Sequence, residues 1–224
     1  MRSIKKGHKI NFLITAGGTR EYIDPVRFIS NASSGKMGYR LAESAKKRNH
    51  NVLLVAAPVN QSIPRGIELL NVTSAGDMFK AVKSNFEKCD CLVMAAAVSD
   101  YTPVKKIDNK IKRSDKNLNL KLKPTKDILK WAGNHKRGKK LVIGFALEDK
   151  NLKTNAERKM KEKNIDIIIA NKPSVIGEEK STVWIKSKTG NWKAIKNKTK
   201  AFIANEIIKL AETLICSRQG YSQE

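Results

Sequence analysis

The run Ile10-Asn11-Phe12-Leu13-Ile14-Thr15-Ala16-Gly17-Gly18 is apolar, contains β-branched side chains and ends in two glycines. Apolar side chains on both faces are typical of a strand buried inside a parallel sheet, where helices cover the sheet on either side. We therefore expect a buried strand over residues 10–16 whose carboxyl end opens into a glycine-containing loop.

Outward from this strand, short apolar runs alternate with stretches of helical periodicity. Further strands are expected at residues 51–56, 92–98, 119–123, 141–147, 165–170 and 182–186. Helices are expected from Ser33-Ser34, which offer an N-cap, to residue 48, and over residues 74–88, 125–131, 155–163 and 198–215. The alternation predicts an α/β fold with a mainly parallel sheet flanked by helices.

Three of these helices carry apolar side chains at helical spacing, which predicts the faces that they turn to the sheet. The inward residues are expected to be Met37, Leu41 and Ala45 in the first, Met78, Val82 and Phe86 in the second, and Phe202, Ile207, Leu210 and Leu214 in the last. The helix at residues 125–131 is expected to end before Gly133.

The length of 224 residues suits one α/β domain with a sizeable core, which we place at residues 1–217. Residues 101–118 are polar, rich in lysine and without periodicity, which indicates a long functional flap or linker. Residues 218–224 are expected to be a disordered tail.

Composition excludes several classes of protein. No stretch approaches the roughly 20 apolar residues of a membrane span. The apolar run after the basic N-terminus lacks the cleavage site of a secretory signal, so we expect a cytoplasmic protein. Cys89, Cys91 and Cys216 are an odd number of cysteines, and we expect buried thiols rather than a disulfide framework.

The chain is strongly basic, with 45 Lys and Arg against 21 Asp and Glu and a formal net charge of +24. Residues 105–163 hold 20 basic and 7 acidic side chains, so the excess is clustered. Such a charge suits an anionic ligand or a nucleic acid. However, the excess is mostly lysine, and aromatic residues make up only 6% of the chain, whereas base recognition favours arginine and stacking aromatics. A lysine-rich surface without a ligand is the other explanation.

Ligands of open parallel sheets bind at the carboxyl ends of the strands, where the strand order reverses. Residues 17–38, 95–100 and 145–148 are expected at this edge. Four glycines and a serine pair at a helix N-terminus suit a phosphate there, although a glycine-rich turn with a serine cap is the structural alternative. The GxGxxG and GxxxxGK[ST] patterns are absent, which disfavours a dinucleotide reductase and a P-loop ATPase.

Charged side chains extend this edge. Asp100 follows an apolar run and suits Mg²⁺, which prefers one or two carboxylates plus substrate phosphates; a turn aspartate bonded to its own backbone is the alternative. Lys159 and Lys163 lie four residues apart and suit a triphosphate, although a solvated helix face is the usual meaning of that spacing. His8, His50 and His135 stand in polar contexts and are expected at the surface. HExxH, CxxC and GxSxG are absent.

Several longer motifs occur in order between about residues 10 and 215. They are Gly17-Gly18-Thr19-Arg20-Glu21, Ile23-Asp24-Pro25-Val26-Arg27, Ile29-Ser30-Asn31, Ser33-Ser34-Gly35-Lys36-Met37-Gly38, Ala95-Ala96-Ala97-Val98-Ser99-Asp100-Tyr101, Lys110-Ile111-Lys112-Arg113, Lys126-Asp127-Ile128-Leu129, Gly144-Phe145-Ala146-Leu147-Glu148, and Ala156, Lys159 and Lys163 before Ala170-Asn171. Together they resemble the phosphopantothenoylcysteine synthetase family, the ligase half of the bacterial bifunctional coenzyme A biosynthesis flavoprotein. The resemblance implies a Rossmann-like, mainly parallel sheet with a smaller mixed-strand segment for dimerisation and for the flap.

The resemblance also implies a ligase that joins 4′-phosphopantothenate to L-cysteine. The substrate carboxylate attacks the α-phosphate of CTP and releases pyrophosphate, and the cysteine amine then displaces CMP from the acyl-cytidylate. Mg²⁺ is the expected cofactor, and ATP stays open as the nucleotide. This chemistry needs charge neutralisation more than a protein nucleophile. An NAD(P)-binding Rossmann-like reductase and a basic nucleic-acid-binding protein are the alternatives.

Residue roles follow from the same resemblance. Asn31 and Lys110 are the expected catalytic residues, Asn31 in converting the acyl intermediate and Lys110 in forming it from a mobile loop. The expected substrate and phosphate residues are Gly17, Gly18, Ser34, Gly35, Gly38, Ala96 and Ala97. The expected nucleotide residues are Met94, Ala95, Ala96, Asp100, Lys110, Lys126, Asp127, Ile128, Leu129, Phe145, Lys159 and Lys163. Asp100 and, second, Asp127 are the expected metal ligands. Lys126 stands where the family usually has proline, which leaves the nucleotide preference open.

Partners are implied as well. The family's ligase is a homodimer, and the basic segment 105–123 is expected to serve both the subunit contact and the active site. Because the sequence lacks a flavin-binding half, we expect no FMN, and a separate phosphopantothenoylcysteine decarboxylase would act on the product. No membrane or nucleic-acid partner is expected.

Overall fold

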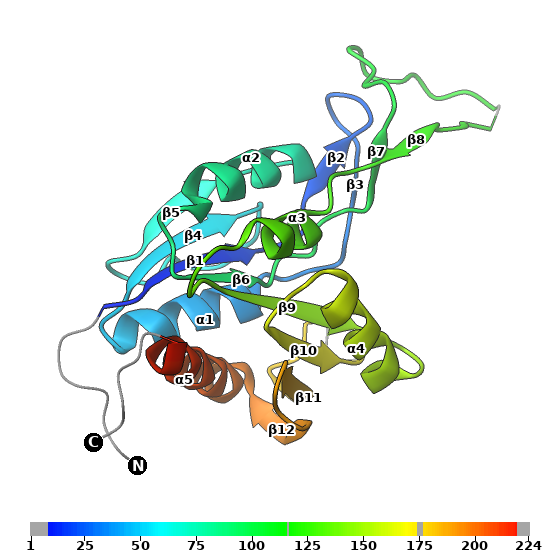
Figure 1. Cartoon of the computed structure of the whole chain (residues 1–224). Coiled ribbons are helices and arrows are strands. Elements are labelled where there is room, and N and C mark those ends of the chain that lie inside the picture. The colour runs from blue at the N-terminus through cyan, green and yellow to red at the C-terminus, as the bar shows by residue number, and fades with distance from the viewer. Residues whose placement is uncertain (1–8, 116, 174–176, 219–224) are drawn as a thin grey trace.

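The computed structural model describes residues 9–115, 117–173 and 177–218 (Figure 1). Within them an eight-stranded sheet has the order β12-β11-β10-β9-β6-β1-β4-β5. Its strands are β1 (Asn11–Ala16), β4 (Asn51–Ala56), β5 (Glu68–Asn71), β6 (Cys91–Met94), β9 (Leu141–Leu147), β10 (Ile167–Asn171), β11 (Lys180–Ser187) and β12 (Lys193–Thr199). Neighbours from β10 to β5 are parallel, whereas β11 and β12 are antiparallel. The expected α/β class and mainly parallel sheet are confirmed.

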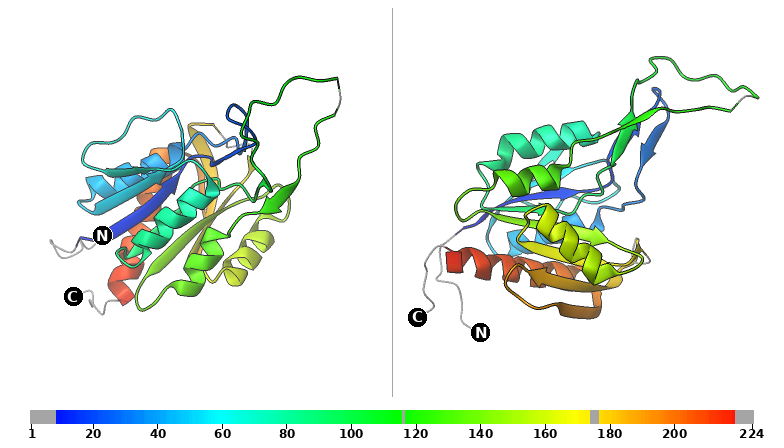
Figure 2. Two further views of the ribbon diagram at one scale, coloured as in Figure 1. Left: turned by 90° about the horizontal axis from the view of Figure 1, so that it is seen from above. Right: turned by 45° about the vertical axis from the view of Figure 1, so that its right-hand side comes forward.

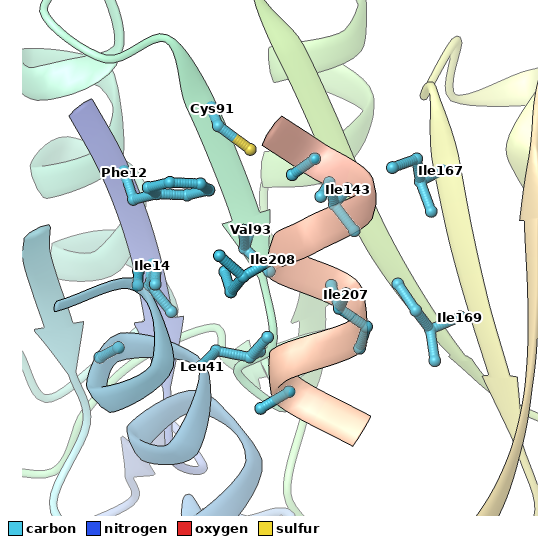
Figure 3. Close-up of a cluster of buried hydrophobic side chains, with 14 of the residues drawn as sticks. Phe12, Ile14, Leu41, Cys91, Val93, Ile143, Ile167, Ile169, Ile207 and Ile208 are labelled. Atoms are coloured by element: carbon cyan, nitrogen blue, oxygen red, sulfur yellow. The ribbon is translucent and has the colours of Figure 1, made fainter. Parts of the chain in front are cut away.

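Helices cover both faces of the sheet, as the two further views show (Figure 2). One face carries α1 (Lys36–Lys47) and α5 (Lys200–Arg218), and the other carries α2 (Ala75–Phe86), α3 (Ile128–His135) and α4 (Leu152–Glu162). The strands alternate between the two layers, since Phe12 and Ile14 face α1 and α5 while Leu13 faces α2. Figure 3 shows Ile207 and Ile208 of α5 in the first of these cores. No helix in the described parts of the chain is long and apolar enough to cross a membrane.

The strand order reverses between β1 and β6. The chain passes from β1 to β4 and β5 on one side and returns through α2 to β6 on the other. Beyond the strand ends, Gly18 and Ala97 form an isolated parallel bridge. This is the place where an open α/β sheet binds its ligand.

Two short hairpins lie beside that edge. β2 (Arg20–Tyr22) pairs with β3 (Phe28–Ser30), and β7 (Tyr101–Pro103) pairs with β8 (Leu122–Pro124). Residues 104–115 and 117–121 extend from β7 and β8 as a long arm, clearly visible in Figures 1 and 2. The flap or linker expected at 101–118 therefore begins with a strand, β7, and the strand expected at 119–123 is observed at Leu122–Pro124 instead. The observed strands are three residues long and depend on pairing across the arm, which local sequence does not reveal.

Several expected boundaries need correction. The strand expected at 92–98 ends at Met94, because the Ala96 N–H donates to Thr15 Oγ1 (3.1 Å) instead of to a backbone carbonyl. Beyond it, Ala97 pairs only through the isolated bridge, in which its N–H donates to the Gly17 carbonyl at 2.8 Å. α3 continues through Gly133, where a Cβ would lie 1.9 Å from the Lys163 carbonyl oxygen. Strands β5 and β12 were not expected, since β5 is only four residues long and largely exposed, and β12 is largely exposed and polar.

The cap expected for α1 was also wrong. The N-cap residue is Gly35, at a φ of 71°, and no side chain in the described chain caps the helix. Ser33 instead accepts a hydrogen bond from the Gly35 N–H at 3.3 Å, so the serine stabilises the preceding turn.

Side-chain placement differs from expectation at both ends of α5. Phe202 is 45% exposed, because the inward face begins at Ile203 and continues through Ile207, Ala211 and Ile215. Arg218 is still helical and donates to the Lys140 carbonyl (3.0 Å) and to Asp166 (2.8 Å), so it does not belong to a tail. Residues 219–224 of the expected tail lie outside the described residues.

Expectations for histidine and cysteine were met only in part. His50 is buried rather than at the surface, because its Nε2 lies 2.7 Å from Glu212 and its Nδ1 accepts the Ile10 N–H. His135 is exposed, and His8 lies outside the described residues. All three cysteines are free thiols, with Cys89 and Cys91 buried and Cys216 half-buried.

Candidate active site

The loop after β1 and the start of α1 form a cradle at the reversal point, which we define as Gly17, Gly18, Asn31 and residues 33–38. The Ala97 carbonyl accepts two hydrogen bonds here, from the Thr19 N–H and from the Asn31 side-chain amide, both at 3.2 Å. The first turn of α1 contains no acidic residue and no side-chain cap in the described chain, which leaves its N–H groups suited to an anion.

Packing also explains one glycine of this cradle. A Cβ on Gly38 would lie 2.5 Å from the Ala16 Cβ, so α1 approaches β1 this closely only with glycine at that position. Gly38 therefore has a structural role whether or not a phosphate binds nearby.

Beside the cradle, a cavity of about 160 Å³ opens at the carboxyl ends of β6 and β9. It is bordered by strand-end residues, by the turn that leads into α3 and by the end of α4. The lining residues are Met94, Ala96, Val98, Asp100, Thr125, Lys126, Asp127, Ile128, Leu129, Phe145, Lys159 and Lys163. The structure thus brings together ten of the twelve residues expected to bind a nucleotide.

Lysines dominate the charge of the cavity. Lys159 donates to the Phe145 carbonyl at 2.8 Å, and Lys163 pairs with Asp127 at 2.8 Å. Burial lowers the pKa of Lys159 and the adjacent positive charge of Lys163 lowers it further, against the opposing effect of nearby carboxylates. Burial alone would raise the pKa of Asp127, but Lys163 and the Lys130 N–H outweigh that effect and lower it.

The two expected metal ligands differ in availability. Asp127 is occupied, since one oxygen caps α3 by accepting the Lys130 N–H (2.9 Å) and the other pairs with Lys163. The Asp100 carboxylate is exposed in the cavity and makes no hydrogen bond or ion pair within the described residues. No group of three His, Cys, Asp or Glu side chains gathers anywhere in the described chain. A single free carboxylate fits Mg²⁺ only when substrate phosphates complete the coordination.

Two expected nucleotide residues lie elsewhere. Ala95 packs against the core on the α1 and α5 side of the sheet, because successive residues of an extended segment alternate between faces. Lys110 is exposed on the arm and does not line the cavity. Lys126 does line it, with its amine 4.9 Å from the centre of the Phe79 ring in α2.

A hydrogen-bonded chain that sequence reasoning missed joins the cradle to the cavity. The Ser99 N–H donates to Thr19 Oγ1 (2.9 Å), and Thr125 Oγ1 donates to the Ser99 carbonyl (2.6 Å). The Thr125 N–H also donates to the Asp100 carbonyl at 2.9 Å. Thr19 and Ser99 are buried and fall inside the quoted motifs, which was the available signal.

The fold and this edge define an α/β protein of the Rossmann-like class with a lysine-lined cavity where the strand order reverses. Residues 7–214 match the family described as the DNA/pantothenate metabolism flavoprotein C-terminal domain. The chain belongs to this family.

Two curated relatives match most of the chain, and their names differ. The chain is 41% identical over 207 residues to a "Cysteine/Cysteine sulfinic acid decarboxylase" of an unknown prokaryotic organism, across 90% of this chain and 58% of the relative. It is 40% identical over 202 residues to the "Coenzyme A biosynthesis bifunctional protein CoaBC" of Bacillus subtilis, across 88% of this chain and 50% of the relative. The chain therefore spans a little over half the length of one of these relatives and half that of the other.

Solved structures match over the whole fold. The crystal structure of the C-terminal domain of a CoaBC protein superposes with a TM-score of 0.80 at 38% identity, covering 92% of this chain and 95% of that one. A Cab2 mutant in complex with phosphopantothenate-cysteine superposes with a TM-score of 0.76 at 19% identity, covering 94% of this chain and 89% of that one, a likeness of fold.

Proposed function

We propose that this chain is a ligase of coenzyme A biosynthesis that forms 4′-phosphopantothenoylcysteine from 4′-phosphopantothenate, L-cysteine and CTP. The observation that carries the proposal is the meeting of an anion cradle and a lysine-lined cavity at one edge, joined through residues 96–98. The name of the Bacillus subtilis relative, a coenzyme A biosynthesis bifunctional protein, supports the same assignment, whereas the other curated relative is named a decarboxylase.

In the first step the substrate carboxylate attacks the α-phosphorus of CTP. The bond between the α-phosphorus and the bridging oxygen breaks, pyrophosphate leaves, and an acyl-cytidylate forms. In the second step the cysteine amine attacks the acyl carbon, CMP leaves with the bonding electron pair, and the amine loses a proton. Negative charge develops on phosphate oxygens in both steps, so positioned cations and N–H donors are the main requirement.

The residues of the site suit these steps. Lys159 and Lys163 would neutralise the triphosphate, and Phe145 would lie beside the base. The cradle would hold the substrate phosphate, with Asn31 near the acyl group and Lys110 reaching the intermediate from the arm. Mg²⁺, held by Asp100 together with the phosphates, would supply further charge neutralisation. No step transfers electrons, so the reaction needs no FMN.

We further propose that two copies associate. Among the described residues, seven of the eleven exposed large apolar side chains lie on the β2–β3 hairpin, on β7 and β8, or on the arm: Val26, Phe28, Tyr101, Val104, Ile107, Leu118 and Leu122. Clustering of exposed apolar side chains on neighbouring elements is typical of an interaction surface.

We also propose that a separate decarboxylase acts on the 4′-phosphopantothenoylcysteine that this chain forms.

Pyrophosphate release tests the function. The purified chain, with Mg²⁺ and 4′-phosphopantothenate and without added FMN, should release pyrophosphate with CTP faster than with ATP. It should form the amide only when L-cysteine is present. Asn31→Asp should lose the product, and Lys110→Gln should leave only a small residual rate of pyrophosphate release. If neither nucleotide yields pyrophosphate, the ligase is excluded, and nicotinamide and nucleic-acid binding become the next assays.

A further inference from the structure

Asp24 is a fully buried carboxylate at the tip of the β2–β3 hairpin. Residues 25–28, which follow it, are all exposed. One carboxylate oxygen accepts the N–H groups of Val26 (2.8 Å) and Arg27 (2.7 Å) and so closes the turn. The other accepts Arg27 Nη1 at 2.5 Å and the N–H of Ile111 at 3.1 Å. The turn needs only the first oxygen, whereas the second reaches 87 residues along the chain to the arm.

Two further hydrogen bonds fix the arm at the same place. Arg27 Nη1 donates to the Ile111 carbonyl at 3.1 Å, and the Ile107 N–H donates to the Ile23 carbonyl at 2.9 Å. Ile111 is thus held through both its N–H and its carbonyl group. Because Ile107 and Ile111 are both bound to the hairpin tip, the short stretch between them, which ends in Lys110, is held at both ends.

The surroundings of Asp24 keep its carboxylate charged. Burial alone would raise the pKa of Asp24, but the hydrogen bonds from Ile111, Val26 and Arg27 outweigh it and lower the pKa to about 2. Asp24 is therefore ionised at any pH suited to an enzyme assay, and Arg27 balances its charge. The same hairpin continues through β3 directly into Asn31.

We propose that Asp24 is a positioning residue, which clips Ile111 to the β2–β3 hairpin and thereby holds Lys110 in a fixed place relative to Asn31. This inference rests on the proposed function, in which those two side chains serve the same acyl intermediate. Asp24 touches no substrate in this role. It acts through its hydrogen bond from the backbone N–H of Ile111.

Asp24→Asn separates the two roles of the carboxylate. Asparagine retains one oxygen for the turn, but its amide cannot accept the Ile111 N–H. The Ile111 amide should exchange with deuterium at least about tenfold faster, since a hydrogen bond to a charged acceptor is lost. The kcat for pyrophosphate release should fall about tenfold or more, while KM for CTP changes less than about threefold, because the cavity does not contain Asp24.

Three companion variants make the test specific. Asp108→Asn removes an exposed arm carboxylate that makes no hydrogen bond or ion pair within the described chain, and it should leave both readouts unchanged. Arg27→Ala removes the contact to the Ile111 carbonyl from an exposed side chain and should loosen Ile111 even if Asp24→Asn folds poorly. In a Lys110→Gln background, Asp24→Asn should lower the residual kcat by less than about twofold, because both changes act on one group.

The possible outcomes distinguish a failure of the positioning role of Asp24 from a failure of the proposed ligase function. Unchanged exchange at Ile111 in both Asp24→Asn and Arg27→Ala would overturn the clip, as would full additivity with Lys110→Gln. An inactive wild-type chain would overturn the proposed function, and Ile111 exchange would then decide about the clip alone.

Discussion

Lys159 is the side chain on which the proposed binding of CTP in the cavity depends most. It is half-buried, bonded to the Phe145 carbonyl, and next to a second lysine, so its charge has few protein partners and is available to an anion. Lys159→Met keeps the length and packing of the side chain but removes the charge. We expect KM for CTP to rise about tenfold or more, the effect of losing one charge-assisted hydrogen bond, in steady-state pyrophosphate assays.

The lowered pKa of Lys159 predicts how binding responds to pH. As the pH rises through that pKa, which lies below the ordinary 10.5, the amine loses its charge and CTP binding weakens. Titration calorimetry between pH 8 and about 10 should show this weakening in the wild type and a flatter profile in Lys159→Met. Lys153→Met, an exposed lysine of the same helix outside the cavity, is the control and should behave like the wild type.

Glu212 offers a stability test away from the site. It is 2% exposed and accepts hydrogen bonds from Arg48 (2.6 Å to each oxygen) and from His50 Nε2 (2.7 Å). Burial alone would raise its pKa, but these two partners lower it below the ordinary 4.5. The unfolded state therefore binds the proton more readily, so this stabilisation is complete above about pH 5 and is lost as the pH falls through the folded pKa.

Glu212→Gln should accordingly lower the free energy of unfolding by about 3 kcal/mol at pH 7, because it leaves a partly buried arginine without its counter-charge. Denaturant titrations should show this difference shrinking towards pH 3. Glu162→Gln is the matched control, since Glu162 is 55% exposed and its pair with Arg158 should contribute less than about 0.5 kcal/mol. A difference that stayed constant with pH would contradict the assignment.

At the scale of single residues, part of the candidate site could be predicted from the sequence. The lining of the cavity was largely predicted, because strand ends and the turn before α3 lie inside recognisable motifs. Thr125 and Val98 were missed, since a threonine and a valine carry no chemical signal until the fold places them. The role of Asp24 depends on Ile111, a partner that no local pattern connects to it. His50 looked like a surface residue because its partner lies 162 positions away.

Elements were predictable where burial was complete. β1, β4, β9 and β10 are apolar on both faces and were anticipated, and Met78, Val82 and Phe86 of α2 are all fully buried as expected. The failures lie at the edges. β5 and β12 are edge strands: β5 is too short to show a pattern, the exposed polar side chains of β12 carry little strand signal, and both pair with a neighbouring strand.

The arm is the element with the clearest separate role. The Val104 N–H donates to the Lys121 carbonyl at 3.0 Å, so residues 105–120 can be replaced by Asn-Gly, a two-residue turn that suits a tight hairpin. The cavity lies outside the replaced segment. We expect the melting temperature to change by only a few degrees and CTP affinity to stay within about threefold, while turnover falls about a hundredfold or more.

Calorimetry on this shortened chain measures its melting temperature and its affinity for CTP, and pyrophosphate assays measure its turnover. The Asp108→Asn variant serves as the control for a small change in the same segment. If the shortened chain retained full turnover, the arm and Lys110 would have no part in the reaction. If the shortened chain lost CTP binding, the arm would contribute to binding of the nucleotide, contrary to this expectation.

For the whole molecule, the charge of +24 bears directly on association. Two copies that meet through the hairpin and the arm bring together surfaces that are both apolar and basic. Repulsion between like charges opposes this contact, and salt screens it over about 10 Å at 0.1 M. Association driven by apolar side chains against such repulsion should strengthen as salt increases, opposite to the behaviour of a complex with nucleic acid.

Sedimentation velocity tests this expectation on the 25.0 kDa chain. We expect a species of twice that mass, with a dissociation constant that falls about tenfold between 0.05 and 0.3 M salt as repulsion is screened. Tyr101→Asp with Leu118→Asp places charge on two exposed apolar positions, 56% exposed each, and should give a monomer with unchanged circular dichroism. Phe202→Asp, on α5 away from the arm, is the control and should remain dimeric. A monomeric wild type at every salt concentration, or a dimer that survives both aspartates, would show that the exposed apolar side chains of the hairpin and arm serve something other than self-association.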